Sequence, residues 1–181
     1  MSILREVTEE KHRRVENLPF IQYLLKGNIS KEHYVYYLYE MLQVYTMLEN
    51  FSKRAGLFEG LDGLERTQNI IDDLQELDSD HSHKLGSSTQ KYIDYLLELF
   101  HSENQQQLFA HVYVRHLGDM YGGKLISRIV PGSGKWYQFD DRAKLVKEFN
   151  NRLKLEHAGE ALKAFDYWEE IFKEMWTKLP K

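Results

Sequence analysis

The feature that most constrains the fold is a set of three glycines inside a stretch with helical periodicity. Apolar residues recur at helical spacing on both sides of its centre: Leu108, Val112, Leu125 and Ile129. A glycine in a helix interior costs about 1 kcal/mol relative to alanine, so Gly118, Gly122 and Gly123 are expected to weaken or kink this helix. Gly118 and Gly122 lie four residues apart and share a face, which predicts a groove without side chains. A flat molecule can approach the backbone closely at such a groove.

Two charged residues, Arg115 and Asp119, flank this predicted groove. Small residues four apart also allow two helices to pack closely, and the spacing alone does not separate the two explanations. The carboxylate of Asp119 favours a binding site, because an ionisable group at a packed helix crossing is costly unless it is partnered.

Composition narrows the class of protein. A length of 181 residues predicts one domain, residues 1–181, and 42% hydrophobic with 29% charged residues is typical of a globular chain. The net charge of −4 argues against a nucleic-acid partner. The sequence has no cysteine, which excludes disulfides and thiolate metal ligands. Neither a signal peptide nor a membrane-spanning apolar run is recognised, so we expect a cytoplasmic protein with no membrane partner.

The pattern along the chain predicts an all-α fold. Ser2 and Ser30 are expected N-caps, Pro19 suits a first helical turn, and Asp140 or Asp141 is expected to cap a later helix. Gly159 is expected to mark a break or bend before the last helix. The predicted helices cover about 2–17, a short segment from 19, 30–54, a segment from after Gly63 to about 78, 88–101, 104–129, a segment after 141, and a last one ending near 178.

Two stretches resemble one known family. The run Tyr113-x-Arg-x-Leu-Gly-Asp-x-x-Gly-Gly123 resembles the distal-helix signature of heme oxygenases. The stretch Leu4–Asn17, with Thr8-x-x-x-His12 ahead of Glu16, resembles the first helix of the same family. The resemblance implies a single-domain helical bundle, with heme held between the first helix and a glycine-kinked distal helix. It also implies oxidative cleavage of heme to biliverdin, with the IX-alpha isomer expected, carbon monoxide and ferrous iron.

The resemblance places the proximal ligand of the heme iron at His12. A neutral imidazole is a common heme ligand, and Glu16 at i+4 can reach its second nitrogen. From spacing alone, His12 is more simply a surface histidine on a charged helix. His111 and His116, on the glycine-bearing helix itself, are expected to be structural or non-ligating, and His81 and His83 to be solvated. The resemblance gives Gly118 and Gly122 the close approach to heme, and Asp119 the task of holding water over the iron.

Other residues are implied contacts of the heme and its propionates. Arg5, Arg115 and Tyr113 match family positions that face the heme edge, and Phe165 matches an aromatic that borders it. Lys144, Lys147 and Arg152 are candidates for the basic residues of the penultimate helix, although no register aligns them cleanly. The simpler explanation for each base is an exposed charge on a solvated face, and for Phe165 it is core packing.

Heme b is expected as both cofactor and substrate, with dioxygen as co-substrate. Neither a flavin nor a nicotinamide motif is recognised, so electrons are expected from an external donor. A basic cluster on the first helix, comprising Arg5, Lys11, Arg13 and Arg14, is predicted to dock an acidic donor such as ferredoxin. A bilin reductase is a candidate downstream partner.

Three alternatives accompany this interpretation. A heme carrier or sensor of the same fold would keep the pocket without turnover, and Asp119 argues against it. A di-iron carboxylate bundle needs two Glu-x-x-His motifs, and only Glu9-Glu-Lys-His12 is found. A thiamin-degrading enzyme of the same architecture uses a nucleophilic cysteine, which this chain lacks.

Overall fold

The computed structural model describes residues 3–77 and 83–179, which form helices and connecting loops. The helices are α1 (Ile3–Glu16), α2 (Pro19–Leu25), α3 (Lys31–Arg54), α4 (Thr67–Leu77), α5 (Ser87–His101), α6 (Leu108–Val112), α7 (Gly118–Ile126), α8 (Arg142–Arg152) and α9 (Ala158–Lys178). Short 3₁₀ turns cover Gln105–Gln107, Lys135–Tyr137 and Leu155–His157. The all-α prediction is confirmed, and no strand is found in the described part of the chain.

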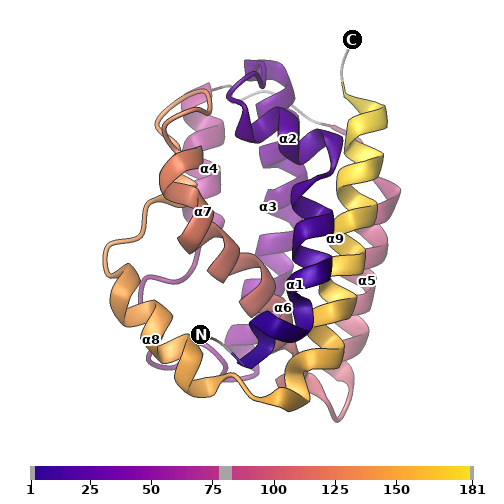
Figure 1. The fold of residues 1–181 in the computed structure, drawn as a ribbon, viewed down its shortest axis with the longest axis vertical. Helices are drawn as coiled ribbons and strands as arrows, with labels where there is room; N and C mark the ends of the chain where they lie inside the picture. Colours follow the sequence, from indigo (N-terminus) through magenta and orange to yellow (C-terminus); the bar gives the residue numbers. More distant parts are fainter. Residues whose placement is uncertain (1–2, 78–82, 180–181) are drawn as a thin grey trace.

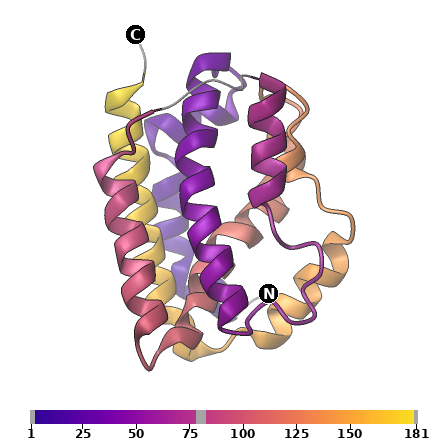
Figure 2. The same cartoon turned by 180° about the vertical axis from the view of Figure 1, so that it is seen from behind.

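Helix α3 is the centre of the bundle. It packs against α4, α5 and α6, and Figure 2 shows α5, α3 and α4 side by side. Helix α9 contacts α1, α2, α5 and α6, and α1 lies along it, whereas α7 runs diagonally on the far side of α1 from α9 (Figure 1). A continuous core of buried apolar side chains joins these helices.

The expected helix ends are largely confirmed. Pro19 begins α2, the Ser30 hydroxyl accepts a hydrogen bond from the backbone N–H of His33 (3.2 Å), and Asp141 accepts one from Lys144 (3.2 Å). The expected cap at Ser2 lies outside the described residues. The predicted break at Gly159 is wrong, because Gly159 lies in the first turn of α9 and the irregular turn precedes it at Leu155–His157.

The glycine-bearing helix differs from the single helix predicted over 104–129. It consists of α6, a π-helical turn at Tyr113–Leu117 and then α7, which ends at Ile126. The irregular geometry therefore precedes the glycines, which lie in regular α-helix. A π turn contains one extra residue per turn and so changes the direction of the side chains that follow it. In this chain the change of direction falls between α6 and α7.

No helix in the described ranges combines the length and the apolar character that a membrane span requires.

Candidate functional site

The three glycines of α7 have different surroundings. A Cβ atom built on Gly118 would meet nothing within 4 Å, and one on Gly122 would meet only Ile126 Cδ1 at 3.7 Å. A Cβ on Gly123 would lie 2.9 Å from Cβ of Tyr137, which is closer than packed side chains allow. Gly118 and Gly122 thus form an open strip on the surface of α7, as the sequence predicted, whereas Gly123 is a packing glycine.

Asp119 is buried beside this strip, with 3% of its surface exposed. Its Oδ2 accepts hydrogen bonds from the hydroxyl of Tyr45 and from Nε1 of Trp136 (3.1 Å). Its Oδ1 lies 3.2 Å from Nη2 of Arg115 in an ion pair one turn apart. Burial raises the pKa of Tyr45 well above its ordinary value, so its hydroxyl stays protonated and donates to the carboxylate. The carboxylate is therefore held by three side chains from three segments.

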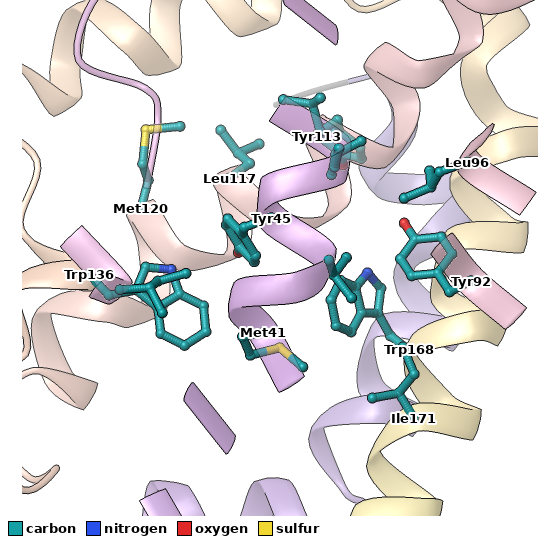
Figure 3. Packing of buried hydrophobic residues seen from close by; sticks show 14 of the residues in the cluster. Met41, Tyr45, Tyr92, Leu96, Tyr113, Leu117, Met120, Trp136, Trp168 and Ile171 are labelled. Atoms are coloured by element: carbon teal, nitrogen blue, oxygen red, sulfur yellow. The ribbon is translucent and has the colours of Figure 1, made fainter. Parts of the chain in front are cut away.

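Arg115 points into the core and binds protein groups. Its Nε donates to the Tyr45 hydroxyl (2.9 Å) and its Nη2 to the Tyr37 hydroxyl (3.1 Å), while its guanidinium lies 4.7 Å from the ring centre of Trp168. Burial alone would lower the pKa of Arg115, but Asp119 and the tyrosines outweigh it and raise that pKa well above its ordinary value. Figure 3 shows Trp136 and Trp168 on either side of Tyr45. The Arg115 guanidinium therefore keeps its positive charge next to the Asp119 carboxylate.

His12 lies on the exposed side of α1. Its side chain is 52% exposed, and its Nδ1 contacts Oε2 of Glu16 at 3.5 Å, which confirms the predicted i+4 pair. The ring of Phe165, on α9, stands edge-on to the imidazole with centroids 5.9 Å apart. One nitrogen of His12 is oriented by a carboxylate and the ring is supported by an aromatic, so Nε2 is the nitrogen suited to a metal.

The other predicted contacts lie in several places. Arg5 is exposed on α1, and Lys144 and Lys147 are exposed on α8. Arg152 donates instead to the carbonyls of Leu57 (3.3 Å) and Glu59 (2.5 Å), which ties α8 to the loop after α3. Tyr113 is buried at the start of the π turn (Figure 3).

The basic cluster on α1 is largely ion-paired. Lys11 pairs with Asp166, Arg13 with Glu9 (2.5 Å) and Arg14 with Glu169 (2.8 Å). Two of these partners lie on α9, so the pairs also fasten α1 to the bundle. The cluster presents less net positive charge than its sequence suggests.

Two histidines of the glycine-bearing helix are fully buried in hydrogen-bond networks. His111 contacts the Tyr92 hydroxyl through Nδ1 (2.8 Å) and Glu160 through Nε2 (3.2 Å). His116 contacts Glu49 through Nε2 (2.9 Å). This agrees with the structural role expected for both.

The remaining histidines of interest lie elsewhere. His83, expected to be solvated, is half-buried against the rings of Tyr36 and Tyr39, and His81 lies outside the described residues. Across the described ranges, no three His, Asp or Glu side chains are grouped so as to hold a metal ion.

Sequence reasoning missed the partners of Asp119. Tyr45 continues the stripe of Tyr34, Tyr37 and Met41 along α3, so helical periodicity places it on the same buried face. Trp136 follows the Pro131–Gly134 loop, and no local pattern connects it with Asp119. Trp168 lies on α9, and its contact with Arg115 depends on how α9 packs against the rest of the bundle.

The all-α bundle, with a glycine strip on one helix and a half-exposed histidine on the first helix, is the arrangement that the sequence resemblance implied. The family model described as Heme oxygenase matches residues 1–174. The chain therefore belongs to the heme oxygenase family.

The individual relatives compared here are each less than 30% identical to this chain. Heme oxygenase 2 of Mus musculus is 29% identical over 96% of this chain and 64% of its own length, so the chain spans less than two thirds of that relative. The heme oxygenase of Rhodella violacea is 28% identical over 84% of this chain and 71% of its own length. The crystal structure of heme oxygenase-1 from Synechocystis, in complex with heme, has a TM-score of 0.84 at 24% identity, covering 97% of this chain and 91% of that one. The last similarity establishes the fold.

Proposed function

We propose that this protein is an active heme oxygenase, which cleaves heme to biliverdin, carbon monoxide and ferrous iron with dioxygen and external electrons. The observation that carries the proposal is the buried carboxylate of Asp119, oriented by Tyr45, Trp136 and Arg115 beside an open glycine strip. A heme carrier has no need of a carboxylate held this firmly beside the bound group.

The described residues fit a heme. Gly118 has open space where a side chain would stand, and His12 offers an oriented imidazole on an exposed helix face. In this proposal α1 and α7 would hold the porphyrin between them, and Phe165, whose ring contacts that of His12, would border it. Arg5, Lys144 and Lys147 are exposed bases suited to the propionates.

Bound heme supplies a redox-active iron that activates dioxygen against its own macrocycle. The chain's residues bind and orient the heme and manage protons around it. Gly118 and Gly122 would let the backbone of α7 approach the porphyrin closely. Asp119 would hold a water molecule beside the glycine strip, and this water could donate protons to the group bound there. Arg115 acts as a positioning residue for Asp119, because its guanidinium contacts both that carboxylate and Tyr45.

A hemin titration with a matched pair of variants tests the proposal. The wild-type chain and His101→Ala, which removes an exposed histidine on α5, are expected to bind one equivalent of hemin with a histidine-ligated absorption spectrum. His12→Ala is expected to lose or shift this spectrum, and added imidazole to restore it. With ferredoxin, its reductase and NADPH, the wild type is expected to release biliverdin and carbon monoxide. A His12→Ala spectrum identical to wild type would refute the ligand assignment, and bound hemin without biliverdin would favour a carrier.

The electron donor and the later fate of the biliverdin product are further parts of the proposal. An acidic electron donor such as ferredoxin is still expected to dock on α1, although the ion pairs of Lys11, Arg13 and Arg14 reduce the net positive charge of that helix. A bilin reductase as downstream partner and a cytoplasmic location also stay predictions.

A further inference from the structure

The indole of Trp136 reaches Asp119 from the loop between α7 and α8. Trp136 is buried on the 3₁₀ turn Lys135–Tyr137, and its Nε1 donates a hydrogen bond to the Asp119 carboxylate (3.1 Å). A 3₁₀ turn of three residues is too short to hold its own position. The place of the indole beside the carboxylate therefore depends on what fastens this turn to the bundle.

Asp73, on α4, binds the N–H groups of the turn. Its side chain is buried, its Oδ1 accepts a hydrogen bond from the backbone N–H of Lys135 (2.7 Å), and its Oδ2 accepts one from the backbone N–H of Trp136 (2.9 Å). The residue before the turn is Gly134, which has no side chain to cap these N–H groups. Asp73 therefore caps the turn, from a position 62 residues before Lys135 in the chain.

Arg66, in the loop just before α4, binds the carbonyl groups of the same segment. Its Nη1 donates to the carbonyl of Gln138 (2.6 Å) and lies 3.5 Å from the carbonyl of Trp136. Its Nη2 donates to the carbonyl of Gly63 (2.5 Å), and its guanidinium lies 4.0 Å from the ring centre of Phe139. The side chain is buried, so one planar group joins the loop before α4 to the loop that carries the indole.

We propose that Asp73 and Arg66 are positioning residues that form a loop clamp and so set the Trp136 indole against Asp119. The inference rests on the proposed function. The two other side chains that contact this carboxylate lie on helical segments, so movement of the loop removes one hydrogen bond and leaves the other contacts. A clamp that serves stability alone would act independently of the indole N–H group.

Four variants separate these two roles. Trp136→Phe keeps an aromatic ring and removes the indole N–H. Asp73→Asn keeps the shape of the side chain but leaves one acceptor for two backbone donors. Arg66→Lys keeps the charge, but a single ammonium does not replace the planar fork. Asp72→Asn is the matched control, because Asp72 lies on the same helix and contacts the Lys135 side chain through an exposed ion pair (3.9 Å).

The first measurement is made on the full chain without heme. Its three tryptophans give three indole N–H signals in a nitrogen-15 correlation spectrum, and Trp136→Phe identifies the signal of Trp136. Asp73→Asn and Arg66→Lys are each expected to move this signal upfield, because the hydrogen bond from the indole to the carboxylate lengthens. Asp72→Asn is expected to leave the signal in place.

The second measurement is the rate of biliverdin formation at full heme occupancy. Trp136→Phe and Asp73→Asn are each expected to lower this rate about tenfold, which corresponds to the loss of one hydrogen bond. The double variant is expected to be no slower than Trp136→Phe alone, because Asp73 acts through an indole N–H that is already absent. Independent effects would instead multiply to a loss of about 100-fold.

Two results would overturn the inference. One is an unchanged Trp136 indole signal in both Asp73→Asn and Arg66→Lys. The other is a double variant about 100-fold slower than wild type, which would give Asp73 a role independent of the indole. If Asp73→Asn does not fold, Arg66→Lys takes its place in the same comparison. Failure of the wild type to form biliverdin would refute the proposed function, whereas the indole signal would still test the loop clamp.

Discussion

At the scale of single residues, the position of the Asp119 carboxylate is set by three specific partners. A buried carboxylate is costly unless its oxygens are satisfied, and here a phenol, an indole and a guanidinium each contact it. Each of these groups donates a hydrogen bond to the carboxylate or pairs with it, so both of its oxygens have partners. An immobile carboxylate can orient a water molecule more strictly than a flexible surface group can.

Replacing Asp119 tests whether this orientation serves the chemistry. Asp119→Ala is expected to keep His12-dependent hemin binding and to lower the rate of biliverdin formation about 100-fold, a typical contribution for a positioned proton-transfer group. Asp119→Asn is expected to be milder, since an amide still holds a water. The measurement is biliverdin yield per bound heme at full occupancy. A normal yield from the alanine variant would exclude Asp119 from the mechanism.

At the scale of one element, α7 carries glycines for two different reasons. Gly118 has open space beside it and Gly123 lies against Tyr137, although both occupy the same regular helix. Helix propensity is the same for both positions, so the difference between them comes only from what faces each one.

A pair of alanine substitutions separates the two reasons. Gly118→Ala is expected to raise the free energy of unfolding by up to about 1 kcal/mol, because alanine favours helix and its methyl group meets nothing. The same change is expected to weaken hemin binding or slow biliverdin formation. Gly123→Ala is expected to lower the melting temperature, because its methyl group would stand 2.9 Å from Tyr137.

Urea unfolding with and without hemin measures the stability and the hemin binding of Gly118→Ala and Gly123→Ala. Loss of stability in Gly118→Ala would show that its face packs on protein rather than on heme.

At the scale of the whole molecule, α5, α6 and α9 are joined by the network around Glu160. This carboxylate contacts His111 (3.2 Å), Tyr95 (2.5 Å) and Lys163 (2.6 Å). Burial works against ionisation, but these partners outweigh it and lower the pKa of Glu160 from 4.5 to about 2. Burial lowers the pKa of His111 below its ordinary 6.5. The network thus contains an ionised glutamate and a neutral histidine.

Both shifts predict lower stability in acid. The unfolded chain protonates His111 near pH 6.5 while the folded chain does not, so stability falls as the pH drops below that value. The contribution of Glu160 is complete above pH 4.5 and is lost as the pH falls toward 2. Glu160→Gln is expected to reduce the loss below pH 4.5, compared with Glu98→Gln, an exposed control on α5. Urea unfolding from pH 7 to 3 measures this, and identical pH profiles would contradict it.

The sequence by itself determined the elements and the open strip. Periodicity, Pro19, Ser30 and Asp141 predicted most helix ends to within a residue or two, because caps and helical faces are local properties. The i+4 pair of His12 and Glu16 was predictable for the same reason. Three glycines near Asp119 indicated a close approach of something flat.

Only the tertiary structure decided what surrounds each of these residues. It assigned Gly123 to packing, moved the irregular turn to Tyr113–Leu117, and turned Arg115 away from the surface toward Asp119. It also brought Trp136 and Tyr45 to the same carboxylate from segments far apart in the chain. These outcomes depend on how helices pack, and packing is set by the shapes of many side chains at once. A local pattern shows which face of a helix is buried, but the partner that covers this face is determined by the rest of the chain.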